Sequence, residues 1–434
     1  MNSFISSRNK VFSIILFLTI VAATINVRAA AFTAGNILVE RVGAGLATLN
    51  SGATNLFIDE YLPGTASQSS PVQGVSLPSV SPRPTANPFN LMDSGSASSD
   101  GQMTRSVDGS VIEMPGYNGI PGDAGIVNSD GATIPRVIGI INSSTSIDTS
   151  RTMNAYTNGN NFRSVISVNG SAFWCAGANS AASSSSLRGI VYFAGSTATK
   201  LFDVNARYIN IASNQLFYST QSGTVGIYAL GSGLPTSGSP TASLVIGPTG
   251  GSPAPEAFQF NPATNICYIA DSRASKGGVF KYSYTGGVWV SNYLFSVSGG
   301  AFGLAVDWSG ANPVIYATTA DGKNLFKITD TGSGSTVTVL ATVDGSTKAF
   351  HGVALAPKSQ TYSITGTTVN NDGSITLTGI SLPNNTNVVM RTTSLTPPIN
   401  WTPVGTNTTD GAGNWQTTDP SPTDPAFYRA VTQP

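Results

Sequence analysis

The sequence has 434 residues, with 21 lysines and arginines, 21 aspartates and glutamates and a net charge of zero. Charged residues make up only 10% of the chain, against about 25% in ordinary globular domains. No segment gathers the basic residues into a stripe, which argues against nucleic acid as a partner. The length is enough for two or more domains.

The N-terminus has the pattern of a secretory signal. Arg8 and Lys10 precede an apolar run from Val11 to Ala23, and three alanines follow at 29–31. This order is typical of a cleaved signal peptide, and the apolar run is short for a membrane anchor. We therefore predict a signal peptide over residues 1–31. The mature protein is expected to be secreted or to reside in the periplasm or cell envelope, with no transmembrane segment.

Short alternating strands separated by turns fill the rest of the chain. The first three are expected near residues 36–42, 55–61 and 72–78, and a Pro-, Ser- and Gly-rich loop over 62–100 flanks the third. A four-stranded unit follows over about 101–152. Asp-Gly and Asn-Gly pairs favour tight hairpins, because these residues adopt positive φ angles easily. The pairs begin at Asp108, Asp130, Asn169, Asp321 and Asp344.

A similar phrase recurs five times from the middle of the chain onward. Each copy is an alternating strand followed by turn residues, and the copies begin at Arg163, Arg207, Glu256, Phe302 and His351. They stand 44, 49, 46 and 49 residues apart. A period of about 40–50 residues in an all-strand chain is typical of a β-propeller. The complete units cover about 163–204, 206–247, 255–298 and 301–343.

The two ends of the repeat region complement each other. The last innermost strand, near 350–357, has no strands after it within the repeat, and the three N-terminal strands lack an innermost partner. Pairing them would complete one more unit and remove an open sheet edge. We therefore predict an all-β fold with a six-bladed β-propeller over residues 32–358. Seven blades are the alternative, if residues 79–135 contain a further one.

The strand spacing changes after Lys358. Six or so short strands are expected over residues 360–434, and this density favours a small β-sandwich as a C-terminal module.

The chain has two cysteines, Cys175 and Cys267. They fall in the second strands of two units that are not neighbours, so their Cα atoms should be too far apart for a disulfide. We predict that both thiols are free.

The opening Phe32–Gly43 and the phrase Leu56–Tyr61 resemble the first strands of a group of uncharacterised secreted bacterial proteins. These proteins join an N-terminal propeller to a sandwich-like C-terminal module. The segments Thr392–Leu395, Trp401–Val404 and Phe427–Arg429 are similar to that terminal module. The shared motifs are structural and the group has no established activity. The resemblance therefore implies the fold and carries over no catalytic residue.

Motifs for enzyme chemistry are absent. His351 is the only histidine, which excludes multi-histidine metal sites, and no Gly-x-Ser-x-Gly elbow accompanies it. Phosphate loops and dinucleotide fingerprints are absent too. We therefore expect no catalytic residue, no metal and no cofactor. A propeller lactonase or lyase would need several acidic or Asn side chains at the channel mouth, and by the repeat only Glu256 stands there.

The first positions of the five repeat copies form one tier, which we call the axial tier: Arg163, Arg207, Glu256, Phe302 and His351. The residues two and four positions further on are mostly apolar, as a packed sheet requires. Equivalent positions on innermost strands lie at equal height around the channel of a propeller. Arg163, Arg207, Glu256 and His351 are therefore candidate ligand-binding residues at the channel mouth, where arginines could hold an anion. The alternative is a salt-bridged rim. Arg105 would be a sixth member if its register matched that of the five copies.

These observations favour a secreted, non-catalytic binding or scaffold protein, expected to be a monomer. Its partner would be an extracellular ligand or an envelope component. One alternative is a lactonase- or lyase-like propeller enzyme that acts on a small anionic or sugar-derived substrate at the channel mouth. Another is attachment to envelope or polysaccharide through the C-terminal module.

Overall fold

The structure is a computed structural model and describes residues 29–157, 159–179, 187–248, 251–358, 362–381, 386–410 and 413–432. These residues form antiparallel strands and one three-residue 3₁₀ turn, Ile126–Asn128. The predicted signal peptide lies almost wholly outside them. The turn is the only helical element described, and it is far too short to cross a membrane.

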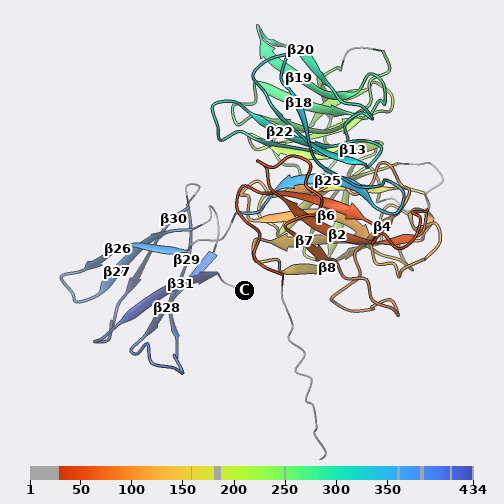
Figure 1. Cartoon of the computed structure of the whole chain (residues 1–434). Helices are drawn as coiled ribbons and strands as arrows, with labels where there is room; N and C mark the ends of the chain where they lie inside the picture. The colour runs from red at the N-terminus through yellow and green to blue at the C-terminus, as the bar shows by residue number, and fades with distance from the viewer. Residues whose placement is uncertain are drawn as a thin grey trace, which may run out of the picture.

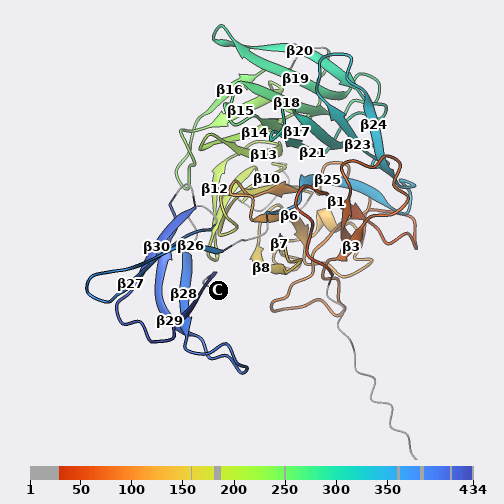
Figure 2. The same cartoon turned by 60° about the vertical axis from the view of Figure 1, so that its left-hand side comes forward.

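Four regular four-stranded blades follow one another from residue 162 to residue 342 (Figure 2). The first two contain β9 (Phe162–Ser167), β10 (Ala172–Gly177), β11 (Ile190–Ala194), β12 (Thr197–Phe202), β13 (Ala206–Ala212), β14 (Gln215–Thr220), β15 (Gly226–Leu230) and β16 (Ala242–Ile246). The next two contain β17 (Pro255–Phe260), β18 (Ile266–Asp271), β19 (Gly278–Thr285), β20 (Val288–Ser296), β21 (Leu304–Asp307), β22 (Val314–Thr318), β23 (Asn324–Thr329) and β24 (Val337–Thr342). These bounds agree with the predicted repeat units.

The ring is closed by strands from its two ends. β25 (Ala349–Leu355) pairs antiparallel with β1 (Ile37–Val42), so that Val353 lies opposite Val39. β1 in turn pairs with β2 (Ala53–Tyr61), and β2 pairs with β3 (Gln73–Ser76). Figure 1 shows β25, coloured blue, among the orange N-terminal strands. The predicted pairing of the two ends is confirmed.

A further blade consists of β5 (Thr104–Arg105), β6 (Val111–Tyr117), β7 (Arg136–Asn142) and β8 (Ile147–Met153). The short strand β4 (Met92–Ser94) pairs with both β2 and β6 and joins this blade to the closing blade. Sequence reasoning missed β4, because three residues inside a Pro- and Ser-rich loop carry no periodicity. The described residues therefore form a six-bladed propeller, and residues 79–135 add no seventh blade.

The innermost strands pack apolar side chains against one another below the axial tier. The residues two positions after the tier are at most 1% exposed: Val165, Ile209, Phe258, Leu304 and Val353. Three of the predicted pairs, at Asp108, Asn169 and Asp321, lie in hairpins within a blade, for example at Gly170 with φ of 80°. The pair at Asp344 lies between β24 and β25, which belong to different blades. The pair at Asp130 instead lies in the loop before β7, where Thr133 N donates to Asp130 O.

Two three-stranded sheets form the C-terminal part. One contains β26 (Ser363–Val369), β27 (Ile375–Ile380) and β30 (Asn414–Asp419), and the other contains β28 (Thr386–Thr392), β29 (Thr402–Thr408) and β31 (Phe427–Thr432). Leu377, Val389 and Trp415, drawn from both sheets, are buried in one cluster. Both views show these sheets beside the propeller (Figures 1 and 2). The domain boundary near residue 358 stays a prediction.

Both cysteines are free and buried. Cys175 lies in β10 and Cys267 in β18, two strands of different blades. This confirms the prediction that the repeat keeps them apart.

Candidate functional site

Irregular strand pairing orients the side chains of the axial tier. Arg163, Arg207 and Glu256 each stand where the register of the innermost strand shifts against its neighbour. The pairing of β1 with β25 shifts in the same way around Glu40 and His351. A β-bulge re-aims the side chain at the irregular position. The innermost strands therefore present polar residues at the channel mouth while the following residues stay in the apolar core.

Arg163 is buried and held by neutral groups. Its Nε donates to Ser99 Oγ at 3.1 Å, and its Nη1 donates to Asn205 Oδ1 at 2.5 Å and to Ala206 O at 2.9 Å. Burial, and then the charge of Arg207, lower the pKa of Arg163 to about 10. The guanidinium therefore remains charged at neutral pH.

Arg207 and Glu256 form the second part of the tier. Glu256 is 3% exposed, and its Oε1 accepts from Gln221 Nε2 at 2.7 Å and from Ser272 Oγ at 3.1 Å. Burial raises the pKa of Glu256, and the charges of Arg207 and Arg163 oppose that rise. Arg207 Nε and Glu256 Oε2 are both buried and have no hydrogen-bond partner.

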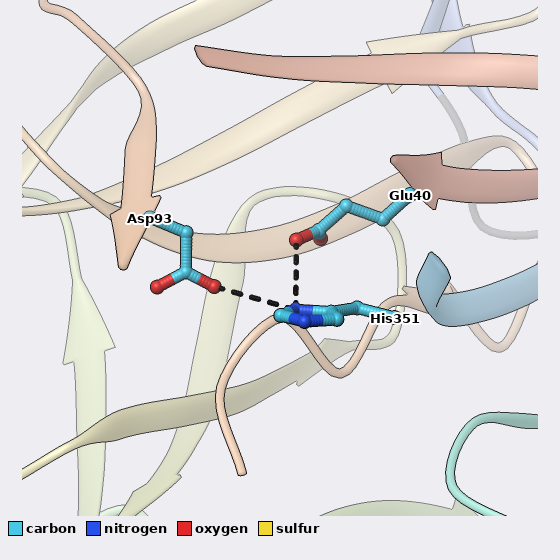
Figure 3. A group of neighbouring side chains, drawn as sticks. All are labelled: Glu40, Asp93 and His351. Atoms are coloured by element: carbon cyan, nitrogen blue, oxygen red, sulfur yellow. Dashed lines mark ion pairs between the residues drawn. The ribbon is translucent and has the colours of Figure 1, made fainter. Parts of the chain in front are cut away.

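His351 faces two carboxylates rather than the arginines (Figure 3). Its Nδ1 lies 3.9 Å from Glu40 Oε1 and 3.8 Å from Asp93 Oδ2. Phe302, the remaining member of the tier, packs edge-on against the imidazole with ring centroids 5.9 Å apart. Burial lowers the pKa of His351 to about 4, so the imidazole is neutral at neutral pH.

The segment 99–103 crosses the channel just inside the tier. Gln102 N donates to Arg163 O, and its Nε2 donates to Phe302 O on the opposite side of the ring. Gly352 N donates to Gly101 O. Met103, at the end of the segment, is 1% exposed. The channel is therefore closed at this level.

Asp100, in the same segment, links the two halves of the site. It is fully buried and accepts hydrogen bonds from Tyr117 Oη at 2.9 Å and from Asn161 Nδ2 at 2.6 Å. Burial, and then the charge of Asp93, raise the pKa of Asp100 to about 7, while the charge of Arg163 opposes that rise.

The two carboxylates beside His351 are strongly perturbed. Burial raises the pKa of Asp93 to about 8. Burial, and then the charges of Asp93 and Asp100, hold the pKa of Glu40 well above its usual range. Burial therefore favours the protonated form of both groups when no counter-charge is present.

Buried polar atoms without partners gather at this end of the channel. Of the ten such side-chain atoms among the described residues, seven belong to six residues of the site: Glu40 gives two, and Asp93, Gln102, Arg207, Glu256 and His351 give one each. Buried polar groups in native proteins are nearly always paired with protein, water or ligand. Such a cluster is a place where water, an ion or a ligand can complete the hydrogen bonding.

A small pocket opens beside His351. Its volume is about 130 Å³, and it is lined by the loop 95–98, by residues 319–322 and by Phe302 and His351. The pocket reaches the histidine end of the tier.

Sequence reasoning placed the four candidate residues on one tier but missed three acids. Glu40, Asp93 and Asp100 also reach the axis, so the expectation that only Glu256 stands at the channel mouth was wrong. Glu40 lies on β1, which is the second strand of its blade. Asp93 lies on β4, and Asp100 follows that strand. No repeat position identifies them. Arg105 does not join the tier, because its Nη1 donates to Ala356 O near the other end of the innermost strands.

The arginines are not neutralised by a closed rim of ion pairs. Neither Arg163 nor Arg207 makes an ion pair among the described residues. The salt-bridged alternative therefore does not describe this tier, and the arginine charges act on Glu256 and Asp100 without direct contact.

No protein-family model matches the sequence, and no curated protein is significantly similar to it. Similar solved structures include a candidate 6-phosphogluconolactonase from Bacteroides uniformis, 11% identical, with 88% of this chain and 99% of that chain covered and a TM-score of 0.38. A gluconolactonase from Xanthomonas campestris is 12% identical, with coverages of 82% and 96% and a TM-score of 0.33. The dihydro-heme d1 dehydrogenase NirN is 10% identical, with coverages of 91% and 77% and a TM-score of 0.34. Likeness at this level transfers no activity to this chain.

Proposed function

We propose that this protein is an extracytoplasmic binding protein that holds a small polar ligand at the axial tier of its propeller. The observation that supports this most directly is the concentration of buried, unpartnered polar atoms at one end of the channel. Each such group costs about 1–3 kcal/mol when it stays unpaired. A ligand that satisfies several of them would recover that free energy on binding.

The pair Arg207 and Glu256 suggests the chemistry of the ligand. Arg207 Nε offers a donor, and Glu256 Oε2 offers an acceptor that an ionised carboxyl leaves open. A hydroxyl group of the ligand would accept a hydrogen bond from Arg207 Nε and donate one to Glu256 Oε2. A bare carboxylate or sulfate would bond to the arginine but would be repelled by Glu256. We therefore expect a hydroxylated, sugar-derived acid rather than a simple anion.

Ligand binding is expected to raise thermal stability. Ligand at a hundredfold excess over its dissociation constant stabilises the fold by about 2.7 kcal/mol. Differential scanning fluorimetry with gluconate, glucuronate, succinate and sulfate should show a shift for the first two, which Arg207→Ala abolishes. Arg151→Ala is the matched control, because Arg151 is also partly exposed but pairs with Asp148 on the outer strand β8. Equal shifts for both variants, or no shift in the parent protein, would contradict the proposal.

Catalysis on such a ligand is the second candidate, favoured by the pocket that opens beside His351. A neutral imidazole flanked by two carboxyl groups could accept a proton from water that attacks a lactone. A panel of sugar lactones, followed by pH-stat titration of the acid released, tests this. We expect any activity to fall at least tenfold in His351→Gln. Ligand binding with no lactone hydrolysis would leave the protein a binder.

A further inference from the structure

We propose that Glu40, Asp93 and His351 form a site for a divalent cation of the Mn²⁺ and Zn²⁺ class. One ligand atom from each residue lies within 4.8 Å of the others. Figure 3 shows the three side chains pointing toward a common centre. They come from three strands, β1, β4 and β25, that the fold brings together only when the ring is closed.

The candidate donor atoms make no hydrogen bond within the described part of the chain. Both carboxylate oxygens of Glu40, Oδ2 of Asp93 and Nδ1 of His351 are buried and unpartnered. Glu40 is 0% and Asp93 1% exposed. The other oxygen of Asp93 accepts from Ser94 N at 2.7 Å, which orients the carboxylate. Acidic clusters on a surface are solvated, whereas these groups are withdrawn from water and aimed at one another.

The spacing fits direct coordination. His351 Nδ1 stands 3.9 Å from Glu40 Oε1 and 3.8 Å from Asp93 Oδ2. A cation equidistant from the three atoms would stand roughly 2.1–2.5 Å from each, within the range of metal–ligand bonds. These separations are too long for hydrogen bonds between the groups. The three atoms are therefore placed as ligands of a common ion rather than as partners of one another.

The donor set selects the kind of cation. Imidazole suits transition metals, and carboxylates suit harder ions, so one histidine with two carboxylates fits Mn²⁺ or Zn²⁺. Three protein ligands leave at least one coordination position open. His351 also lines the pocket of about 130 Å³, from which water or a ligand oxygen could complete the coordination.

A bound divalent cation would also balance the charge around the axis once it displaces the protons of the carboxyl groups. Four buried carboxyl groups stand there, Glu40, Asp93, Asp100 and Glu256, against the two guanidinium groups of Arg163 and Arg207. With all six ionised the site carries two negative charges in excess. One divalent cation balances them.

Gly101 fits closely against this site. Its φ is +73°, and a Cβ there would lie 2.4 Å from Glu40 Oε1 and 2.7 Å from His351 Nδ1. The backbone of the segment 99–103 therefore covers the cluster on the inner side. The ion would be covered on that side, and His351 would connect it to the pocket.

Metal alone is sufficient to test the proposal, with no organic ligand present. The full chain is stripped with EDTA, dialysed and titrated with Mn²⁺, and binding is followed by the loss of the free-ion signal in electron paramagnetic resonance and by calorimetry. We expect one site per chain. Mn²⁺ is the main probe because the thiols of Cys175 and Cys267 could capture Zn²⁺ in any unfolded fraction.

Matched variants assign the ion to this cluster. Asp93→Asn and Glu40→Gln keep the shape of each side chain and should weaken Mn²⁺ binding at least tenfold. Glu113→Gln is the control, because Glu113 is also buried but accepts a hydrogen bond from Ser167 Oγ on another blade. This variant should bind Mn²⁺ as tightly as the parent protein does. Circular dichroism confirms that each variant is folded, and if one is not, His351→Gln takes its place. Absence of binding in the parent, or unchanged binding in the folded variants, overturns the proposal. Neither result bears on the ligand proposed for Arg207 and Glu256.

Discussion

Replacing Gly352 with alanine is expected to destabilise the propeller by about 3 kcal/mol or more, at the upper end of the cost of overpacking a core. A Cβ at this position would lie 2.2 Å from Met103 N and 2.4 Å from Gly101 O. Both contacts are with backbone, so no side-chain rotation relieves them. The hydrogen bond from Gly352 N to Gly101 O would be lost or distorted, and β25 would be pushed away from the segment that closes the channel.

Chemical denaturation and thermal unfolding measure this effect. A loss of this size should lower Tm by roughly 5 °C or more. Gly334→Ala is the control, because nothing lies within 4 Å of its Cβ position and its φ is not in the left-handed region. It should change stability by less than about 1 kcal/mol. If the two variants unfold alike, the segment 99–103 does not pack against β25.

Raising the pH from 5 to 8 is expected to destabilise the parent protein relative to Glu113→Gln by about 4 kcal/mol, or about 1.4 kcal/mol per pH unit. Glu113 on β6 is fully buried, and burial raises its pKa to about 8 despite hydrogen bonds from Ser167 and Thr104. The nearby Asp108 raises it further. The buried thiol of Cys175 also lies within electrostatic reach.

The sign follows from the protons bound. Between the unfolded pKa of about 4.3 and the folded value of about 8, the native state holds a proton on Glu113 that the unfolded state has lost. The stabilisation is therefore complete below about pH 4 and disappears as the pH rises through 8. Glutamine does not titrate, so the free energy of unfolding of Glu113→Gln lacks this dependence on pH. Urea unfolding of both proteins in EDTA from pH 5 to 9 measures the difference, and parallel curves would show that Glu113 is ionised in the native state.

The sequence by itself determined the architecture of this protein. A strand phrase that returns every 44 to 49 residues predicts blades, because each blade must bury the same apolar positions against its neighbours. The same alignment located Arg163, Arg207, Glu256 and His351 on one tier. It also predicted that β25 pairs with one of the first N-terminal strands, since an unfinished blade at each end leaves complementary open edges, and the structure shows that strand to be β1. All of these follow from local alternation and a fixed period.

Only the tertiary structure decided which acids reach the axis. Glu40 and Asp93 stand 53 residues apart, and both lie far in the chain from His351. Their meeting depends on three non-local events: the closure of the ring by β25, the pairing of β4 with β2, and the register shift around Glu40. None of these has a period, and a shift of one residue in a strand moves its side chains to the other face. The candidate cation site is therefore a property of the closed ring, while the blades are a property of the repeat.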